Sequence, residues 1–331
     1  MERIDNRYMR RALELARHGL GNASPNPMVG AVIVHDGRII GEGYHRRCGD
    51  GHAEVNAIAS VSPDNRGLLS SATIYVTLEP CSHYGKTPPC AKLIIDTGIP
   101  RVVIGAVDPF EKVAGRGVAM LRKAGIEVTT GVLDRECREL NRRFFTAHTL
   151  RRPFVTLKWA QSSDGFLDCV REAGMNAYKF STPLTSLFTA RLRSLHDAIL
   201  TSAATVNADN PRLTVRRWAG RQPVPVILDR GGNVSRDALL LQNPATITIS
   251  SATIDEALAA IYERGITSVL VEAGPRLLHA FIASGLWDEA RVEVAPIILG
   301  EKGCGKAPQI DAEPSGNDRL GQNYFYYYRN Y

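Results

Sequence analysis

Three residues with metal-binding side chains constrain the fold of this chain more than any other feature of its sequence. His52 begins a His-Ala-Glu tripeptide, Cys81 follows Glu79-Pro80, and Cys90 lies nine residues further on. One imidazole and two thiolates are ligands that tetrahedral zinc prefers, and they leave one position for water. The spacing therefore predicts a fold that brings residues 52, 81 and 90 together around Zn²⁺.

A glutamate two residues after the histidine indicates the chemistry of such a site. Glu54 is placed to take a proton from water and to pass it to a nitrogen of the substrate. Hydroxide would attack a ring carbon that carries an amino group, and ammonia would leave. His-x-Glu followed by Pro-Cys and a second cysteine is typical of zinc deaminases. Cys81 is expected at a helix start, where the helix dipole favours a thiolate.

Two plainer interpretations of these residues stay open. His52 could be a core histidine beside two buried thiols, or a closed structural zinc site could take Cys48 as its fourth ligand. Both leave the spacing of His52 to Glu54 and the Pro-Cys pair unexplained, so a catalytic zinc site is favoured.

The hydrophobic pattern alternates between strand and helix periods along the chain. Asp5 is expected to cap the first helix, and Asp36-Gly37 to form a hairpin turn. The other predicted strands are 29–34, 39–40, 74–78, 102–106, 126–129, 154–159, 198–201, 224–228, 246–250, 268–272, 291–295 and a terminal strand at 324–328; the other helices are 53–60, 90–96, 118–123, 133–147, 185–194, 254–263 and 277–284. This alternation predicts an α/β fold with sheets covered by helices.

The length of 331 residues is sufficient for two domains. Pro153 ends a short polar segment and cannot continue a helix, so we expect domains at 1–148 and 149–331. Apolar residues make up 44% and charged residues 22% of the chain, which excludes collagen-like and disordered classes.

Charge and cysteine content restrict the partners and the compartment. Residues 1–148 carry 20 basic and 16 acidic side chains and the rest carry 20 and 18, so no basic stripe for nucleic acid is expected. The N-terminus has no apolar core of a signal peptide, and no run approaches the roughly 18 apolar residues of a membrane span. Six irregularly spaced cysteines fit reduced thiols in a cytoplasmic protein. A small-molecule ligand is the better expectation.

Longer stretches of the sequence resemble a known enzyme family. PNPMVGAVIV, HAEVNAI, TLEPCSHYGKTPPC and DPFEKVAGRG resemble the deaminase domain of the bifunctional riboflavin-biosynthesis deaminase/reductases. Eight residues separate the two cysteines, as is typical of this family, where a generic zinc deaminase has two. TLKWAQSSDGFL, TSAATVNADNPRLTVR and LVEAGPRLLHAFI resemble its reductase domain. The resemblance covers nearly the whole chain.

The family resemblance implies a fold and two successive reactions. It implies an N-terminal cytidine-deaminase-like three-layer α/β/α domain, then a C-terminal dihydrofolate-reductase-like α/β domain. The first would use Zn²⁺ to deaminate 2,5-diamino-6-ribosylamino-4(3H)-pyrimidinone 5′-phosphate. The second would use NADPH to reduce the ribosyl chain of 5-amino-6-(5-phosphoribosylamino)uracil to ribityl. A homo-oligomer is also implied.

The resemblance assigns roles to residues of the deaminase half. His52, Cys81 and Cys90 would be the zinc ligands and Glu54 the proton shuttle. The substrate pocket would be lined by Asn26, His45, Lys86 and Asp108. The Asn26 amide can bind the polar edge of a ring, and Lys86 can pair with a phosphate, although it could also be an ordinary solvated lysine.

The reductase half has its own implied residues. Lys158, Asp209 and Glu272 would be catalytic, with Lys158 suited to bind the pyrimidine carbonyl. Arg193 and Arg216 would contact the substrate phosphate, because a guanidinium binds phosphate bidentately. Ser162, Thr205 and Gly274 would bind NADPH, and Gly274-Pro275 forms a glycine turn that leads into a helix. A salt-bridged Lys158 and ordinary surface arginines are the plainer interpretations.

Departures from the family pattern leave two alternatives. Phe110 in the first domain stands where the family often has another residue. Lys179, Ser186 and Pro225 do so in the second domain, which could therefore be a non-catalytic scaffold. The zinc motif alone would also suit a nucleic-acid-editing deaminase, which needs a basic surface with interleaved aromatic residues. The even charge distribution opposes that interpretation.

Overall fold

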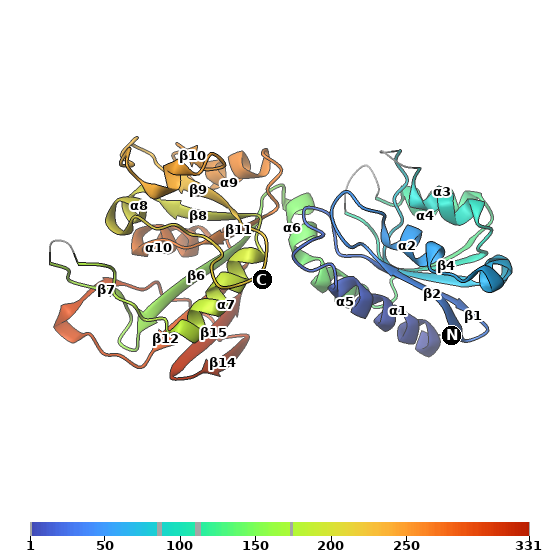
Figure 1. The fold of residues 1–331 in the computed structure, drawn as a ribbon, viewed down its shortest axis with the longest axis horizontal. Coiled ribbons are helices and arrows are strands. Elements are labelled where there is room, and N and C mark those ends of the chain that lie inside the picture. Colours follow the sequence, from blue (N-terminus) through green and yellow to red (C-terminus); the bar gives the residue numbers. More distant parts are fainter. Residues whose placement is uncertain (1, 85–87, 110–113, 173–174, 331) are drawn as a thin grey trace. The chain divides into compact units, whose positions relative to one another are not determined.

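The computed structural model describes residues 2–84, 88–109, 114–172 and 175–330. The chain divides into two compact units, Met1–Leu150 and Arg151–Tyr331, each with its own core (Figure 1). The division lies two residues beyond the expected boundary. Among the described residues, no helix is long and apolar enough to cross a membrane.

The first unit contains one five-stranded sheet. Its strands are β1 (Gly30–His35), β2 (Arg38–Tyr44), β3 (Thr73–Leu78), β4 (Arg101–Ala106) and β5 (Glu127–Thr130). They lie in the order β2-β1-β3-β4-β5; β1 is antiparallel to β2 and β3, and β3, β4 and β5 are parallel. Asp36 and Gly37 both have positive φ, which a two-residue hairpin turn of type I′ requires, and the turn joins β1 to β2 as predicted.

Helices cover both faces of this sheet. They are α1 (Glu2–Arg17), α2 (Ala53–Ala59), α3 (Cys90–Asp96), α4 (Arg116–Lys123), α5 (Asp134–Leu140) and α6 (Arg142–Leu150), with a 3₁₀ helix η1 (Pro63–Ser71). Successive residues of a strand face opposite sides: Ile33 packs with α2, α3 and α4, whereas Val32 packs with α1, α5 and α6. Two apolar cores therefore enclose the sheet, and the predicted three-layer α/β/α arrangement is confirmed (Figure 1).

The second unit contains an eight-stranded sheet and a two-stranded sheet. The strands are β6 (Phe154–Ser162), β7 (Phe166–Cys169), β8 (Ala198–Ser202), β9 (Val224–Leu228), β10 (Ile247–Ile249), β11 (Ser268–Val271), β12 (Glu289–Ala295), β13 (Gly303–Lys306), β14 (Gly316–Leu320) and β15 (Asn323–Arg329). The large sheet has the order β10-β9-β8-β11-β6-β12-β15-β14, in which the strands from β10 to β12 are parallel. The terminal aromatic strand is confirmed as β15, antiparallel to β12.

Helices also pack against the large sheet of the second unit. They are α7 (Pro183–Ser194), α8 (Ala203–Asp209), α9 (Ile254–Tyr262) and α10 (Pro275–Ser284), with 3₁₀ helices η2 (Leu239–Gln242) and η3 (Gly300–Lys302). Residues of α9 and α10 form one core with the sheet, and residues of α7 and α8 form another. Parallel strands run to the same edge, so the segments after β6, β8 and β11 meet at the carboxyl end of the sheet, where open α/β sheets bind ligands.

Several elements differ from the sequence predictions. Asp5 lies inside α1 rather than before it, because its carboxylate hydrogen-bonds Tyr75 and Arg101 instead of the helix backbone. The long helix predicted at 133–147 is two helices that meet at Asn141, whose side-chain amide is hydrogen-bonded to the backbone of Met28. The strands β7, β13 and β14 and the helix α8 were not predicted.

Candidate functional site

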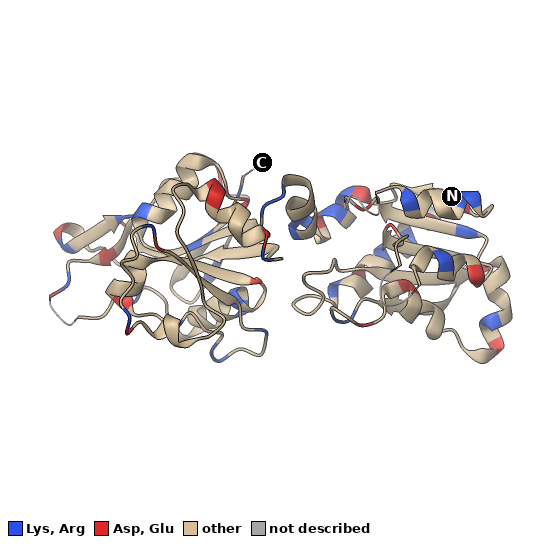
Figure 2. Cartoon of the chain, turned by 90° about the horizontal axis from the view of Figure 1, so that it is seen from above, with Lys and Arg blue, Asp and Glu red and all other residues tan. Residues whose placement is uncertain are grey.

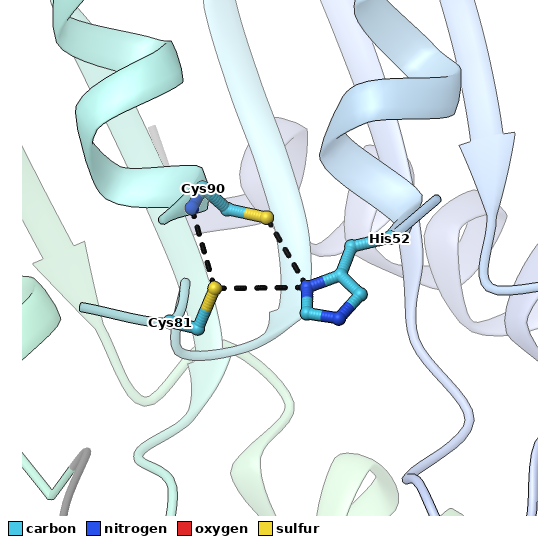
Figure 3. A group of neighbouring side chains, drawn as sticks. All are labelled: His52, Cys81 and Cys90. Atoms are coloured by element: carbon cyan, nitrogen blue, oxygen red, sulfur yellow. Dashed lines mark hydrogen bonds between the residues drawn. The ribbon is translucent and has the colours of Figure 1, made fainter. Parts of the chain in front are cut away.

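The three predicted zinc ligands converge in the first unit (Figure 3). His52 immediately precedes α2, Cys90 is the first residue of α3, and Cys81 lies in the segment after β3. Nδ1 of His52 lies 3.3 Å from Sγ of Cys90 and 3.6 Å from Sγ of Cys81. The ligand atoms all lie within 4.8 Å of one another. One nitrogen and two sulfur donors at this separation fit a single tetrahedral zinc ion.

The surroundings of Cys81 favour its thiolate. A hydrogen bond with the Cys90 side chain lowers the pKa of Cys81 to about 4 against the effect of burial, and His52 and a backbone N–H contribute to the lowering. That N–H belongs to Cys90 and lies 3.2 Å from Sγ of Cys81. The expectation that Cys81 itself begins a helix is wrong; Cys90 occupies the helix start and donates its free N–H to Cys81.

Glu54 lies beside the three ligands in the first turn of α2. Its side chain is almost completely buried, with the residue 3% exposed, and burial raises the pKa of Glu54 to about 7. The charge of His52 and a hydrogen bond with Cys90 act in the opposite direction. The short spacing of His52 and Glu54 therefore puts a carboxylate next to the metal ligands, as the sequence predicted.

Two of the predicted substrate residues meet near the ligands. The side-chain amide of Asn26 lies 3.1 Å from Nε2 of His45, whose Nδ1 lies 3.2 Å from the Gly51 carbonyl. The His45 ring is 5.4 Å from the His52 ring, edge to face. Burial lowers the pKa of His45, so its neutral form is favoured.

Of the other two predicted substrate residues, the structure describes Asp108 but not Lys86. Asp108 is buried just after β4, and its backbone N–H donates to the Glu79 carboxylate at 3.3 Å. Lys86 lies outside the described residues.

Glu79 is a site residue to which sequence analysis gave no role. Its buried carboxylate accepts hydrogen bonds from the backbone N–H groups of Asp108, Gly115 and Val118 at 3.3, 3.0 and 3.1 Å. Gly115 and Val118 belong to the first turn of α4 and its cap, so Glu79 occupies the helix N-terminus. Glu79 thereby links the segment that carries Cys81 to α4. The sequence signal was a charged residue directly after a mostly apolar strand.

A partly buried ion pair lies at the carboxyl end of the large sheet in the second unit. Glu272 follows β11, and its carboxylate accepts two hydrogen bonds of 2.7 Å from Nε and Nη2 of Arg193 on α7. Burial by itself raises the pKa of Glu272, but the charges of Arg193 and Lys158 outweigh it and hold the pKa below its ordinary value. Arg193 also donates to the Thr214 carbonyl at 3.0 Å. Arg193 is thus paired with Glu272, and its contact with a substrate phosphate stays a prediction.

The predicted NADPH residues form hydrogen bonds within the second unit. Thr205 and Gly274 bond to each other, and Ser162 bonds within a turn. Thr205, in α8, accepts a hydrogen bond of 3.0 Å from the backbone N–H of Gly274, which caps α10. Ser162 ends β6, and its hydroxyl accepts from the backbone N–H of Phe166 at 2.9 Å, which fixes the turn into β7.

The remaining predicted reductase residues have different surroundings. Asp209 ends α8 and pairs with Arg171 at 2.7 Å, and Arg171 also pairs with Asp168. Lys158 lies in the middle of β6, and Arg216 is exposed in the segment after α8.

The segment at which the chain departs from the family pattern is firmly anchored. Ser181 donates to the fully buried carboxylate of Glu293 at 2.6 Å. Asn323 donates to the same carboxylate at 2.6 Å and to the Phe180 carbonyl at 3.0 Å. Phe180 and Ser181, which directly follow Lys179, are therefore held to β12 and β15.

Comparison with known proteins places both units in one family. The cytidine and deoxycytidylate deaminase zinc-binding region matches residues 2–106, and the RibD C-terminal domain matches residues 153–313. Riboflavin biosynthesis protein RibD of Aquifex aeolicus is 41% identical over 90% of this chain and 88% of its own length.

Solved structures agree over nearly the full length. RibD of Acinetobacter baumannii superposes with a TM-score of 0.88 at 33% identity, covering 98% of each chain. A second solved structure is the diaminohydroxyphosphoribosylaminopyrimidine deaminase/5-amino-6-(5-phosphoribosylamino)uracil reductase of Thermotoga maritima. It superposes with a TM-score of 0.87 at 37% identity, covering 99% of each chain. These matches confirm the predicted deaminase and reductase folds. The chain therefore belongs to the RibD family of bifunctional riboflavin-biosynthesis enzymes, in which a zinc-binding deaminase domain is followed by a reductase domain.

Proposed function

We propose that the first unit hydrolytically deaminates 2,5-diamino-6-ribosylamino-4(3H)-pyrimidinone 5′-phosphate, and that the second unit reduces the ribosyl chain of the product with NADPH. The observation that carries the first step is the convergence of His52, Cys81 and Cys90 beside the buried Glu54. The two activities for which the Thermotoga maritima relative is named support the choice of substrates.

Five side chains of the first unit would bind and protonate the substrate. Zinc held by the histidine and two cysteines supplies the Lewis acidity that makes hydroxide available near neutral pH. Glu54 takes a proton from water at its carboxylate and delivers it to the amino nitrogen, which leaves as ammonia. Asn26 and His45, already hydrogen-bonded to each other, hold the polar edge of the pyrimidine ring. Asp108 lines the same pocket, and Lys86 pairs with the phosphate.

In the second unit the partly buried pair of Arg193 and Glu272 would set the charge of the site. Arg193 keeps Glu272 ionised, because its charge and its hydrogen bonds lower the pKa of Glu272, and the charge of Lys158 contributes to that lowering. Lys158 then donates to the carbonyl of the pyrimidine, and Asp209 orients the ribose. Arg216, which is exposed in the segment after α8, binds the substrate phosphate through its guanidinium.

NADPH would bind where α8 meets the start of α10. The N-terminus of α10 follows Gly274 and presents backbone N–H groups to a phosphate. Thr205 holds the Gly274 backbone in place, and Ser162 shapes the turn after β6. The cofactor supplies the hydride, and these residues place the sugar C1′ against it.

One assay with two variants tests both activities. Glu54→Gln should retain zinc and lose ammonia release from the diaminopyrimidinone nucleotide, while NADPH oxidation with the deaminated intermediate persists. Lys158→Ala should do the converse, because it leaves the zinc site intact. Normal deamination by Glu54→Gln contradicts the proton shuttle, and unchanged NADPH oxidation by Lys158→Ala contradicts its role.

The same assay separates the alternative functions. Ammonia release without NADPH oxidation from the deaminated intermediate would favour a scaffold role for the second unit. Activity on RNA with none on the nucleotide would favour a nucleic-acid-editing deaminase.

The protein is proposed to act on small molecules in the cytoplasm, without a nucleic-acid partner. Basic and acidic residues are interspersed along the ribbon of both units, which supports the absence of a nucleic-acid surface (Figure 2). A homo-oligomer is proposed from the family resemblance, and light scattering of the purified protein measures it.

A further inference from the structure

The segment between Asp209 and Arg216 has an unusual backbone. Six residues other than glycine have positive φ among the described residues, and three of them lie here or directly after it: Asn210 at 40°, Leu213 at 48° and Arg217 at 62°. Left-handed conformations are unfavourable for residues with a Cβ, and they persist only where the surrounding contacts enforce them. The contacts that hold this segment therefore have to be found elsewhere in the second unit.

Gln222 makes one of these contacts with both polar groups of Val215. The backbone N–H of Val215 donates to Oε1 of Gln222 at 2.8 Å, and Nε2 of Gln222 donates back to the Val215 carbonyl at 3.0 Å. The side-chain amide thus pairs with a residue as a neighbouring strand would. Gln222 lies two residues before β9, whose first residue, Val224, bonds the Asp197 carbonyl at 2.8 Å. The pairing therefore fixes Val215 to the central sheet.

The adjacent carbonyl is held from a second direction. Arg193 donates to the Thr214 carbonyl at 3.0 Å while it pairs with Glu272. Two successive peptide groups, at 214 and 215, are consequently fixed by side chains from α7 and from the start of β9. Arg216 is the next residue. The contacts of residues 214 and 215 fix the backbone that leads into Arg216. Within the described parts of the chain, no hydrogen bond or ion pair involves its guanidinium, so the side chain is available to bind a ligand.

We propose that Gln222 is a positioning residue for the substrate phosphate. By pairing with Val215 it holds the backbone that presents the Arg216 guanidinium to the 5′-phosphate. The inference rests on the proposed function, because it takes Arg216 as the phosphate-binding arginine. Ordering the backbone of this segment before binding removes an entropic cost that a mobile backbone would incur when substrate arrives.

A side chain that only stabilises the fold would affect all substrates alike, so the test compares two substrates. Gln222→Met keeps the length of the side chain and removes both hydrogen bonds. Its KM for the deaminated nucleotide should rise about tenfold, with kcat within about twofold of the original, because binding and not hydride transfer is weakened. Its KM for the same compound without the phosphate should not change. Gln242→Met, at an exposed glutamine in η2, is the matched control and should change neither value.

A double variant tests whether Gln222 acts through Arg216. Arg216→Ala should raise KM for the phosphorylated substrate alone, and adding Gln222→Met should raise it little further. If Gln222→Met does not fold, Gln222→Glu keeps the acceptor for the Val215 N–H, and loss of the donor should give the same selective rise.

Three outcomes overturn the inference in an active enzyme. They are an equal rise in KM for both substrates, no rise for either, and a full additional rise in the Arg216→Ala background. A chain that reduces neither substrate before any substitution contradicts the proposed function instead, and the inference with it.

Discussion

Asp5 lies in α1 with its carboxylate buried between two partners. Tyr75 donates to it at 2.9 Å, and Arg101 binds both oxygens at 3.1 and 2.9 Å. Burial by itself raises the pKa of Asp5, but the hydrogen bonds from Arg101 and Tyr75 outweigh it and leave the pKa below its ordinary value of 3.8. This single side chain therefore joins α1 to β3 and β4 in a way that depends on its charge.

Replacing Asp5 with an uncharged residue should reveal how the stabilisation by its carboxylate depends on pH. We expect Asp5→Asn to lower the free energy of unfolding by about 2 kcal/mol near neutral pH, because a partly buried guanidinium loses its anion. A carboxyl whose pKa is lowered by folding stabilises the protein above its unfolded pKa, and the effect is lost as pH falls through the folded value. The difference in the free energy of unfolding between Asp5→Asn and the original protein should therefore shrink below about pH 3.8.

Urea unfolding at several pH values measures this difference. Asp64→Asn, at an exposed position, is the control and should have little effect at any pH. A constant difference from neutral to acidic pH would show that Asp5 acts through its shape and not its charge.

At the scale of elements, α4 is fitted closely against the segment that carries Cys81. Glu79 caps its first turn, and Gly117 faces the Pro80 carbonyl so closely that an added Cβ would lie 2.1 Å from that oxygen. Real Cβ atoms are not found so close to another atom, so any larger residue must push the two elements apart. The glycine thus serves the packing of a helix onto a metal-ligand segment.

We expect Gly117→Ala to destabilise the protein and to weaken zinc binding. Alanine normally stabilises a helix relative to glycine by about 1 kcal/mol, but overpacking here should cost about 1–3 kcal/mol and displace Pro80 and Cys81. Thermal unfolding and competition with a coloured chelator measure the two effects. Gly67→Ala, where an added Cβ meets nothing within 4 Å, is the control. A more stable Gly117→Ala protein with normal zinc affinity would contradict the packing argument.

At the scale of the whole molecule, each unit has its own cores and its own ligand. The zinc residues His52, Cys81 and Cys90 lie in Met1–Leu150, and the residues proposed for NADPH lie in Arg151–Tyr331. A ligand that binds only the folded state stabilises the part of the chain that binds it.

Zinc removal should therefore act on one unit. A chelator should abolish ammonia release and lower the melting temperature of the first unit, while NADPH oxidation with the deaminated intermediate continues. NADPH at 100 times its Kd should stabilise the second unit by about 2.7 kcal/mol. Calorimetry of the full chain, with and without each ligand, tests this. Loss of NADPH oxidation on chelation would contradict separate sites.

The sequence by itself determined the zinc ligands, the neighbouring glutamate and the α/β class. His52, Cys81 and Cys90 were predictable because ligand chemistry depends on side-chain type, and the strands were predictable because apolar periodicity is local. Short elements such as β7 and β13 were missed because four residues carry too little periodicity.

Only the tertiary structure decided which polar side chains are partners. Arg193 and Glu272 are 79 residues apart in sequence, and Glu79 reaches backbone groups 29 to 39 residues away. An arginine that binds a carboxylate has the same sequence signature as one that binds a phosphate. The partner depends on which groups packing brings together and removes from water, because a buried charge must find its counter-charge or hydrogen bonds there.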